Sequence, residues 1–137
     1  RTGELIEAAP GFMLVVSYNP GYQNLLKGMK PSTRQRFVAL RFDYPMPEVE
    51  QQILIKETGV DAHLAFKLVE LAGALRKLEQ NDLDEVASTR LLIYAARMIS
   101  TGMNVLDVCR CCLAEPLSDD PQTVKALMDV AKIYFDE

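Results

Sequence analysis

The sequence has no tryptophan, one histidine and three cysteines among its 137 residues. Cys109, Cys111 and Cys112 lie so close together that they cannot form a long-range disulfide framework, which favours a reducing compartment, the cytoplasm. Helical spacing places Cys109 and Cys112 on one apolar face, so buried, reduced cysteine is a better interpretation than a metal site. His63 has no obvious partner and is expected to be an exposed helix residue.

Several functional signatures are also missing. No apolar run reaches the roughly 18 residues of a membrane span, and the N-terminus lacks the pattern of a signal peptide. A net charge of −4 argues against a general nucleic-acid or membrane binder. Basic residues nevertheless cluster in one stretch without acids, where they could meet an anion: Lys27, Lys30, Arg34, Arg36 and Arg41.

That basic stretch lies between two strand-like runs. Residues 12–18 are almost continuously apolar, which is typical of a strand covered on both faces. Residues 38–44 alternate apolar and polar, which suits a strand near a sheet edge. Asn19 follows the first run, and Arg34 and Arg36 precede the second, so an α/β protein could present these polar groups to a phosphate.

Two strands make a poor sheet by themselves. The sequence also begins at Arg1 rather than at a methionine. We therefore expect the chain to be cut from a longer protein, with the missing strands upstream of Arg1.

The rest of the chain is predicted to be a compact bundle of five helices. Capping residues, prolines and glycines mark the helix ends, and Glu48 and Glu50 follow Pro47 as acids in the first turn of the first helix. Apolar residues recur at the helical period and are expected to be buried, in the second helix Leu64, Leu68, Leu71, Ala72, Leu75 and Leu78, and in the third Leu91, Leu92, Tyr94, Ala95, Ala96, Met98 and Ile99. The predicted helices begin at Pro47, Asp61, Ser88 or Thr89, Asn104 and Asp120-Pro121. Gly59 ends the first, the second fades into Gln80-Asn81-Asp82, Gly102 stops the third, and Pro116 follows the end of the fourth.

Four ordered motifs carry a resemblance to a known family. They are Ser17-Tyr18-Asn19-Pro20-Gly21-Tyr22-Gln23, Ser32-Thr33-Arg34-Gln35-Arg36-Phe37, Phe42-Asp43-Tyr44-Pro45 and Ser88-Thr89-Arg90. In this order they resemble the C-terminal half of the CbbQ/NirQ/NorQ proteins, AAA+ ATPases of the MoxR group. The resemblance implies an α/β fragment that is mostly α. Residues 1–45 would supply the last two strands of the AAA+ core, and residues 46–137 an all-α helical lid.

The resemblance also implies a function. Members form hexameric rings that use ATP and Mg²⁺, and they work with a von Willebrand factor A domain partner. Their clients are Rubisco, which they activate, or nitric oxide reductase, which they help to mature. By motif, Asn19 matches the first sensor, Arg36 the arginine finger with Arg34 as second choice, and Arg90 the second sensor, which contacts nucleotide. The P-loop and the magnesium-binding motif lie upstream in the family, and no Gly-x-x-x-x-Gly-Lys-Ser/Thr occurs here. This chain alone should therefore not hydrolyse ATP.

Each site residue has a plainer alternative. Asn19 can simply belong to an Asn-Pro-Gly turn. Arg36 can be a surface arginine paired with Asp43, and Arg90 can be solvated or paired with Asp84 or Glu85. For the whole chain, the alternative is a non-catalytic helical module that docks on a partner protein.

Overall fold

The computed structural model describes residues 3, 7–17, 30–78 and 87–135. The chain divides into two compact units, Arg1–Arg41 and Phe42–Glu137.

The N-terminal unit contains one short helix in its described part, α2 (Pro31–Arg34). Ala9-Pro10-Gly11 forms a turn: the Phe12 N–H donates to the Ala9 carbonyl at 3.0 Å, and Gly11 has φ +80°. A positive φ of this kind favours glycine. The described residues of this unit are all exposed, including every residue of α2.

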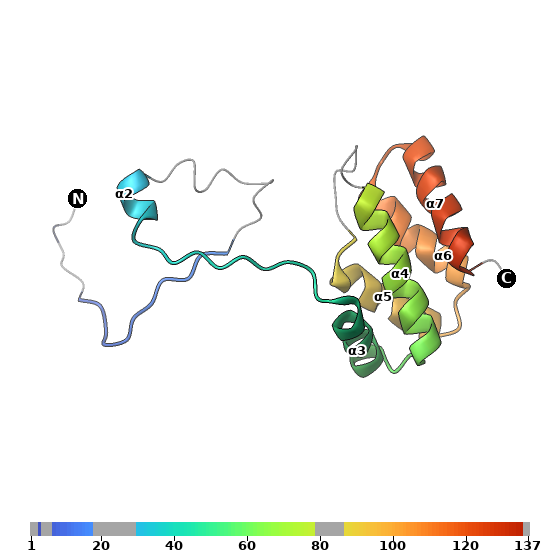
Figure 1. Ribbon diagram of the computed structural model, residues 1–137, viewed down its shortest axis with the longest axis horizontal. Coiled ribbons are helices and arrows are strands. Elements are labelled where there is room, and N and C mark those ends of the chain that lie inside the picture. Colours follow the sequence, from blue (N-terminus) through green and yellow to red (C-terminus); the bar gives the residue numbers. More distant parts are fainter. Residues whose placement is uncertain (1–2, 4–6, 18–29, 79–86, 136–137) are drawn as a thin grey trace. The chain divides into compact units, whose positions relative to one another are not determined.

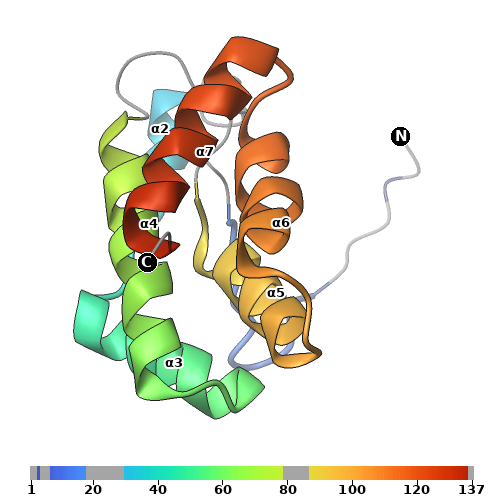
Figure 2. The same cartoon turned by 90° about the vertical axis from the view of Figure 1, so that its right-hand side faces the viewer.

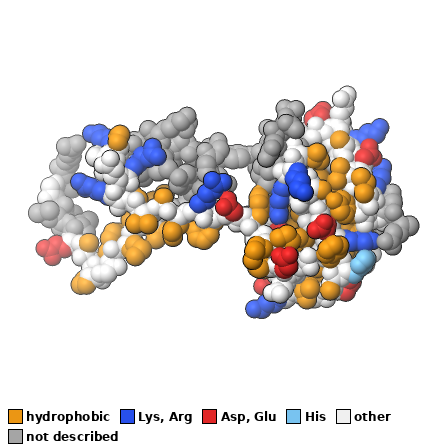
Figure 3. Space-filling model, in the orientation of Figure 1, with side chains coloured by type: hydrophobic (Ala, Val, Ile, Leu, Met, Phe, Trp, Pro, Cys, Tyr) orange, Lys and Arg blue, Asp and Glu red, His pale blue; other side chains and the backbone are white. Residues whose placement is uncertain are grey.

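The two predicted strands are not formed in the described part of this region. Residues 12–17 and 38–44 have no strand hydrogen bonding, and Tyr18 lies outside the described residues. Phe12 is 71% exposed and Val38 90% exposed, and Figure 3 shows such apolar side chains in orange at the surface. A strand needs a neighbour to pair its backbone groups and cover its side chains. The predicted AAA+ core in residues 1–45 therefore stays a prediction.

The helical unit contains the five predicted helices (Figure 1). The fourth continues beyond its α-helical part through a π-helical segment, Arg110–Ala114, and a 3₁₀ turn, Glu115–Leu117. Pro116 therefore lies within this 3₁₀ turn rather than after the end of the helix. The α-helices are α3 (Pro47–Thr58), α4 (Ala62–Leu78), α5 (Thr89–Ser100), α6 (Val105–Cys109) and α7 (Pro121–Phe135).

The predicted helix ends agree with the observed hydrogen bonds. Gly59 ends α3 with φ +73°, a left-handed conformation that glycine adopts at little cost. The Asp61 carboxylate accepts from the Leu64 N–H at 2.9 Å at the start of α4, and Asn104 accepts from two N–H groups at the start of α6. Side-chain caps of this kind satisfy donors that the first helical turn leaves unpaired.

The core lies between these helices. α3 packs against α4 and α5, and α7 packs on α4 and α6 (Figure 2). Two predicted core positions are wrong: Leu78 and Tyr94 are exposed, Leu78 because it is the last residue of α4. The apolar stripes otherwise supply the fully buried side chains, among them Leu54, Leu68, Leu71, Leu75, Leu92, Leu113 and Leu117.

Within the described segments, none of the helices combines the length and the apolar character that a membrane span requires.

Candidate functional site

Among the predicted site residues, Asn19 lies outside the described residues. Arg34 and Arg36 lie together at the end of α2. Arg34 is the last helical residue, and the Arg36 N–H donates to the Thr33 carbonyl at 3.1 Å in the turn that follows. Both arginines are exposed. Their side chains are therefore open to a ligand or to another subunit.

Arg90 lies in the other unit, at the second position of α5. Ser88 caps this helix by accepting from the Leu91 N–H, and Arg90 is exposed. A cation at a helix start is disfavoured by the helix dipole. An exposed, planar and permanently charged guanidinium nevertheless suits an anionic phosphate ligand. The nucleotide role that the family resemblance implies for Arg90 stays a prediction.

A buried ion pair lies directly behind the start of α5. The Arg76 guanidinium on α4 donates two hydrogen bonds to the Glu50 carboxylate on α3, at 2.8 and 2.9 Å. The two side chains are only 13% and 1% exposed, respectively. This is a bidentate, charge-assisted contact of the strong kind.

Three further contacts extend the pair. The Thr89 hydroxyl donates to the Glu50 Oε1 at 2.6 Å, and the Arg76 Nε donates to the Ala87 carbonyl at 2.8 Å. The Arg76 guanidinium also lies over the Tyr44 ring, 3.9 Å from its centroid. We call Glu50, Arg76 and Thr89 the polar cluster. It joins α3, α4 and α5, and Tyr44 adds the segment that leads into α3.

The electrostatics of the cluster favour a charged Glu50. Burial by itself would raise the pKa of this carboxyl group. The hydrogen bonds from Arg76 and Thr89 and the positive charge of Arg76 outweigh burial, so the pKa of Glu50 lies below its ordinary value of 4.5. Glu50 is therefore an ionised structural group near neutral pH rather than a general acid.

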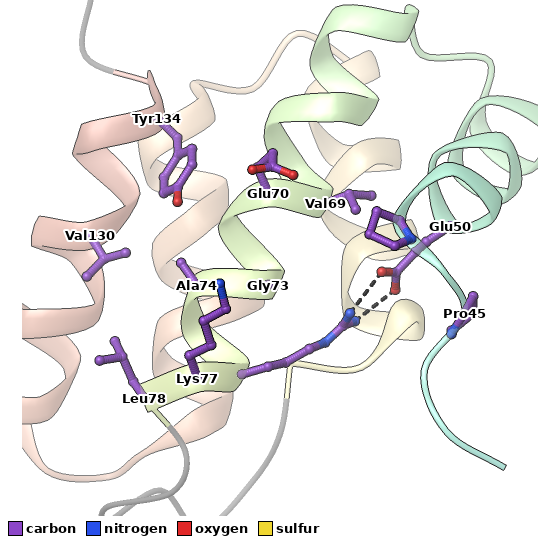
Figure 4. A pocket seen from close by; sticks show the side chains of 12 residues that line it. Pro45, Glu50, Val69, Glu70, Gly73, Ala74, Lys77, Leu78, Val130 and Tyr134 are labelled. Atoms are coloured by element: carbon purple, nitrogen blue, oxygen red, sulfur yellow. Dashed lines mark hydrogen bonds and ion pairs between the residues drawn. The ribbon is translucent and has the colours of Figure 1, made fainter.

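A pocket of about 420 Å³ opens beside the cluster, between α3, α4 and α7 (Figure 4). Glu70, Lys77 and Tyr134 line it together with apolar side chains, and dashed lines in Figure 4 mark the bonds of Glu50 to Arg76. Arg90, which the structure does describe, is not one of the residues that line this pocket. Arg90 therefore contributes nothing to this pocket.

The cysteines behave as the sequence predicts. Cys109 and Cys112 are buried and Cys111 is exposed, and all three are free thiols. Burial raises the pKa of Cys109 to about 12 and that of Cys112 to about 11, with smaller contributions from neighbouring thiols. Among the residues that the structure describes, no cluster of His, Cys, Asp and Glu could hold a metal ion. His63 is exposed, as predicted.

Sequence reasoning missed the polar cluster. Glu50 was interpreted only as an acid in the first turn of a helix, which it is, but it is also buried. A usable signal was present. Glu50 precedes Leu54 by four residues and Arg76 follows Ala72 by four, so each charge lies on the apolar face of its own helix. Opposite charges on two buried faces indicate an internal ion pair.

Comparisons with known proteins identify relatives of this chain. The family model described as "CbbQ/NirQ/NorQ C-terminal" matches residues 50–134, from Glu50 almost to the end of α7. The chain is 69% identical to the denitrification regulatory protein NirQ of Stutzerimonas stutzeri, 53% to protein NorQ of Paracoccus denitrificans and 50% to protein CbbQ of Hydrogenophilus thermoluteolus. Each match covers 98% of this chain and 49%, 50% and 51% of the relative, respectively.

The chain therefore belongs to the CbbQ/NirQ/NorQ family of AAA+ proteins, which confirms the resemblance found in the sequence. It spans about half the length of the curated relatives it matches. Its helical unit contains the whole region that the family model describes as C-terminal.

Proposed function

We propose that this chain is part of an AAA+ ATPase that hydrolyses ATP to remodel or activate a client enzyme. The observation that carries this proposal is the family match over residues 50–134, together with 69% identity to a denitrification regulatory protein. ATP would supply the phosphoryl bond whose cleavage drives the remodelling. Because the P-loop motif is not in this sequence, the 137-residue chain alone is expected to be inactive.

Each predicted site residue has a role in this proposal. Arg90 would contact the phosphates of ATP bound in its own subunit. Arg36 would reach the site of the neighbouring subunit, where a guanidinium can neutralise charge that develops during phosphoryl transfer. Arg34 is the second candidate for that role. Asn19 would position the attacking water, and this role stays a prediction from the motif.

The proposal implies an assembly. An arginine that acts across a subunit boundary requires a head-to-tail interface, which closes into a ring. We propose a hexamer that works with a von Willebrand factor A domain partner in the cytoplasm, with Mg²⁺ bound by family motifs outside this sequence. The client would be of the Rubisco or the nitric oxide reductase type.

The test is the ATPase activity of the full-length protein. Arg36→Ala should lower kcat by about 10³-fold, the low end of what an arginine finger contributes. Arg34→Ala is the matched control, because Arg34 and Arg36 are both exposed and lie at the end of the same short helix. Native mass spectrometry should find the same ring in each variant.

Two results would contradict the assignment. Full activity of an assembled Arg36→Ala ring removes Arg36 from the role, and a loss confined to Arg34→Ala transfers the role to Arg34. Loss of the ring itself would instead identify Arg36 as an assembly residue.

A second candidate is a non-catalytic interaction module. It is favoured by the helical unit, whose described residues include a buried apolar core of their own. In that case the full-length protein would bind its partner with equal affinity with and without ATP. A partner affinity that depends on ATP would exclude this candidate.

A further inference from the structure

We infer that the polar cluster of Glu50, Arg76 and Thr89 is a positioning device for Arg90: it fixes the start of α5, from which Arg90 reaches the phosphates of ATP. The inference rests on the proposed nucleotide role of Arg90. It assigns a task to three residues that none of the four sequence motifs explains as a group.

The hydrogen bonds of the polar cluster converge on the start of α5. Arg76 donates to the Ala87 carbonyl, and Glu50 accepts from the Thr89 hydroxyl. The chain is therefore hydrogen-bonded on either side of Ser88. Ser88 itself caps α5. Arg90 is the next residue after Thr89. The backbone that carries Arg90 is thus held through side chains of two other helices, α3 and α4.

The buried ion pair gives its neighbours a fixed direction. A buried ion pair is weak evidence for stability, because apolar residues of similar volume often serve as well or better. Charged hydrogen bonds, unlike apolar contacts, have a fixed direction. Among the described residues, the Arg76 and Glu50 side chains form hydrogen bonds to each other, to the Thr89 hydroxyl and to the Ala87 carbonyl. The described side-chain N and O atoms that are buried all have partners, so this geometry is fully satisfied.

Solvent exposure rises from the polar cluster to Arg90. Glu50 is completely buried, Thr89 is half-buried and Arg90 is exposed. The buried cluster thus supports Thr89, and the exposed Arg90 is the next residue. Such rigid support helps a flexible side chain to meet a ligand in one geometry. Tyr44 adds to this support, because its ring stacks on the guanidinium that donates to the Ala87 carbonyl.

Thr89→Val in the full-length protein is the informative substitution. It removes the hydroxyl but keeps the branched shape of the side chain. Glu50 Oε1 still accepts from Arg76 at 2.8 Å, so no buried charge is left alone. The matched control is Thr101→Val at the other end of α5, where the hydroxyl donates only to the Met98 carbonyl of its own helix.

The measurement is equilibrium binding of a fluorescent ATP analogue, with KM and kcat determined in parallel. We expect Arg90→Ala to weaken binding by about tenfold or more, and Thr89→Val by about 3- to 10-fold. The Thr89→Val/Arg90→Ala double variant should bind like Arg90→Ala alone, because Thr89 acts through Arg90. Thr89→Ser should restore affinity, and Thr101→Val should leave it unchanged.

The outcomes separate the inference from the function on which it rests. Wild-type affinity in Arg90→Ala would overturn the nucleotide role of Arg90 and this inference with it. Wild-type affinity in Thr89→Val, or losses that multiply in the double variant, would overturn the inference alone. Thermal unfolding of each variant completes the set. If Thr101→Val weakens binding as much as Thr89→Val at an equal loss of stability, the cluster merely stabilises the helical unit.

Discussion

The two units differ in what their apolar residues do. In the N-terminal unit, the described apolar side chains are exposed, although their pattern is that of strands. In the helical unit, apolar residues at the helical period form a buried core with a satisfied ion pair inside it. Helices pair their backbone groups locally, whereas strands depend on neighbours that this chain does not supply within its described part. Periodicity therefore predicts structure best where the element can satisfy its own backbone.

The largest expected effect tests the ion pair of the helical unit. Glu50→Ala removes one partner and leaves the Arg76 guanidinium, 13% exposed, without its carboxylate. Leaving one charge of a buried pair alone typically destabilises a protein by about 3–5 kcal/mol. Urea unfolding of the 137-residue chain, followed by circular dichroism, measures this loss. Glu48→Ala, at an exposed position on the same helix, is the control and should unfold like the wild type. An equal loss of unfolding free energy in both variants would mean that the ion pair does not contribute more than an exposed glutamate.

A leucine in each unit tests the comparison directly. Leu68 is fully buried in α4, and Leu14 is 61% exposed. Leu68→Ala should cost about 2–5 kcal/mol, because it removes buried methyl groups and leaves a cavity. Leu14→Ala should cost less than about 0.5 kcal/mol by the same urea titration of the 137-residue chain. A comparable loss in Leu14→Ala would show that the N-terminal unit has a core of its own.

The smallest expected effect is a change with pH. The folded-state pKa of Glu50 is lowered, so between that pKa and 4.5 the unfolded chain binds more protons than the folded one. Stability therefore rises with pH in this window. The contribution of Glu50 is complete above 4.5 and is lost as the pH falls through its folded-state pKa.

Glu50→Gln isolates this contribution. Glutamine cannot ionise, so the difference in unfolding free energy between wild type and variant should shrink as the pH falls from about 6 to about 3. A difference that is constant over this range would mean that Glu50 has the same pKa folded and unfolded. Three exposed aspartates, whose pKa values are also lowered by local hydrogen bonds, are common to both proteins and cancel: Asp61, Asp120 and Asp129.

The sequence predicted the parts of the fold that local chemistry determines. Gly59 and Asn104 mark a helix end and a helix start because one residue's conformation or side chain suffices for each. Burial of Leu68 and Leu92 followed from the helical period alone. The exposed Arg36 and Arg90 were located by motif, and their roles stay proposals.

The polar cluster escaped prediction because its members come from three distant parts of the chain. Glu50 and Arg76 are separated by 26 residues, and Glu50 and Thr89 by 39. Periodicity places each charge on the apolar face of its own helix, but it does not show which partner that charge meets. Only the packing of α3 against α4 and α5 makes them one buried group. Pairing between elements is a tertiary property, and helical periodicity does not encode it.

The stacking of Tyr44 on Arg76 sets a practical limit on how this domain can be excised for study. A fragment trimmed to the family match would begin at Glu50 and discard the aromatic ring. Its α5 would then rest on a guanidinium with one face open to water. Expression of the domain from Phe42 onward keeps the Tyr44 ring on the guanidinium and preserves the native surroundings of the start of α5.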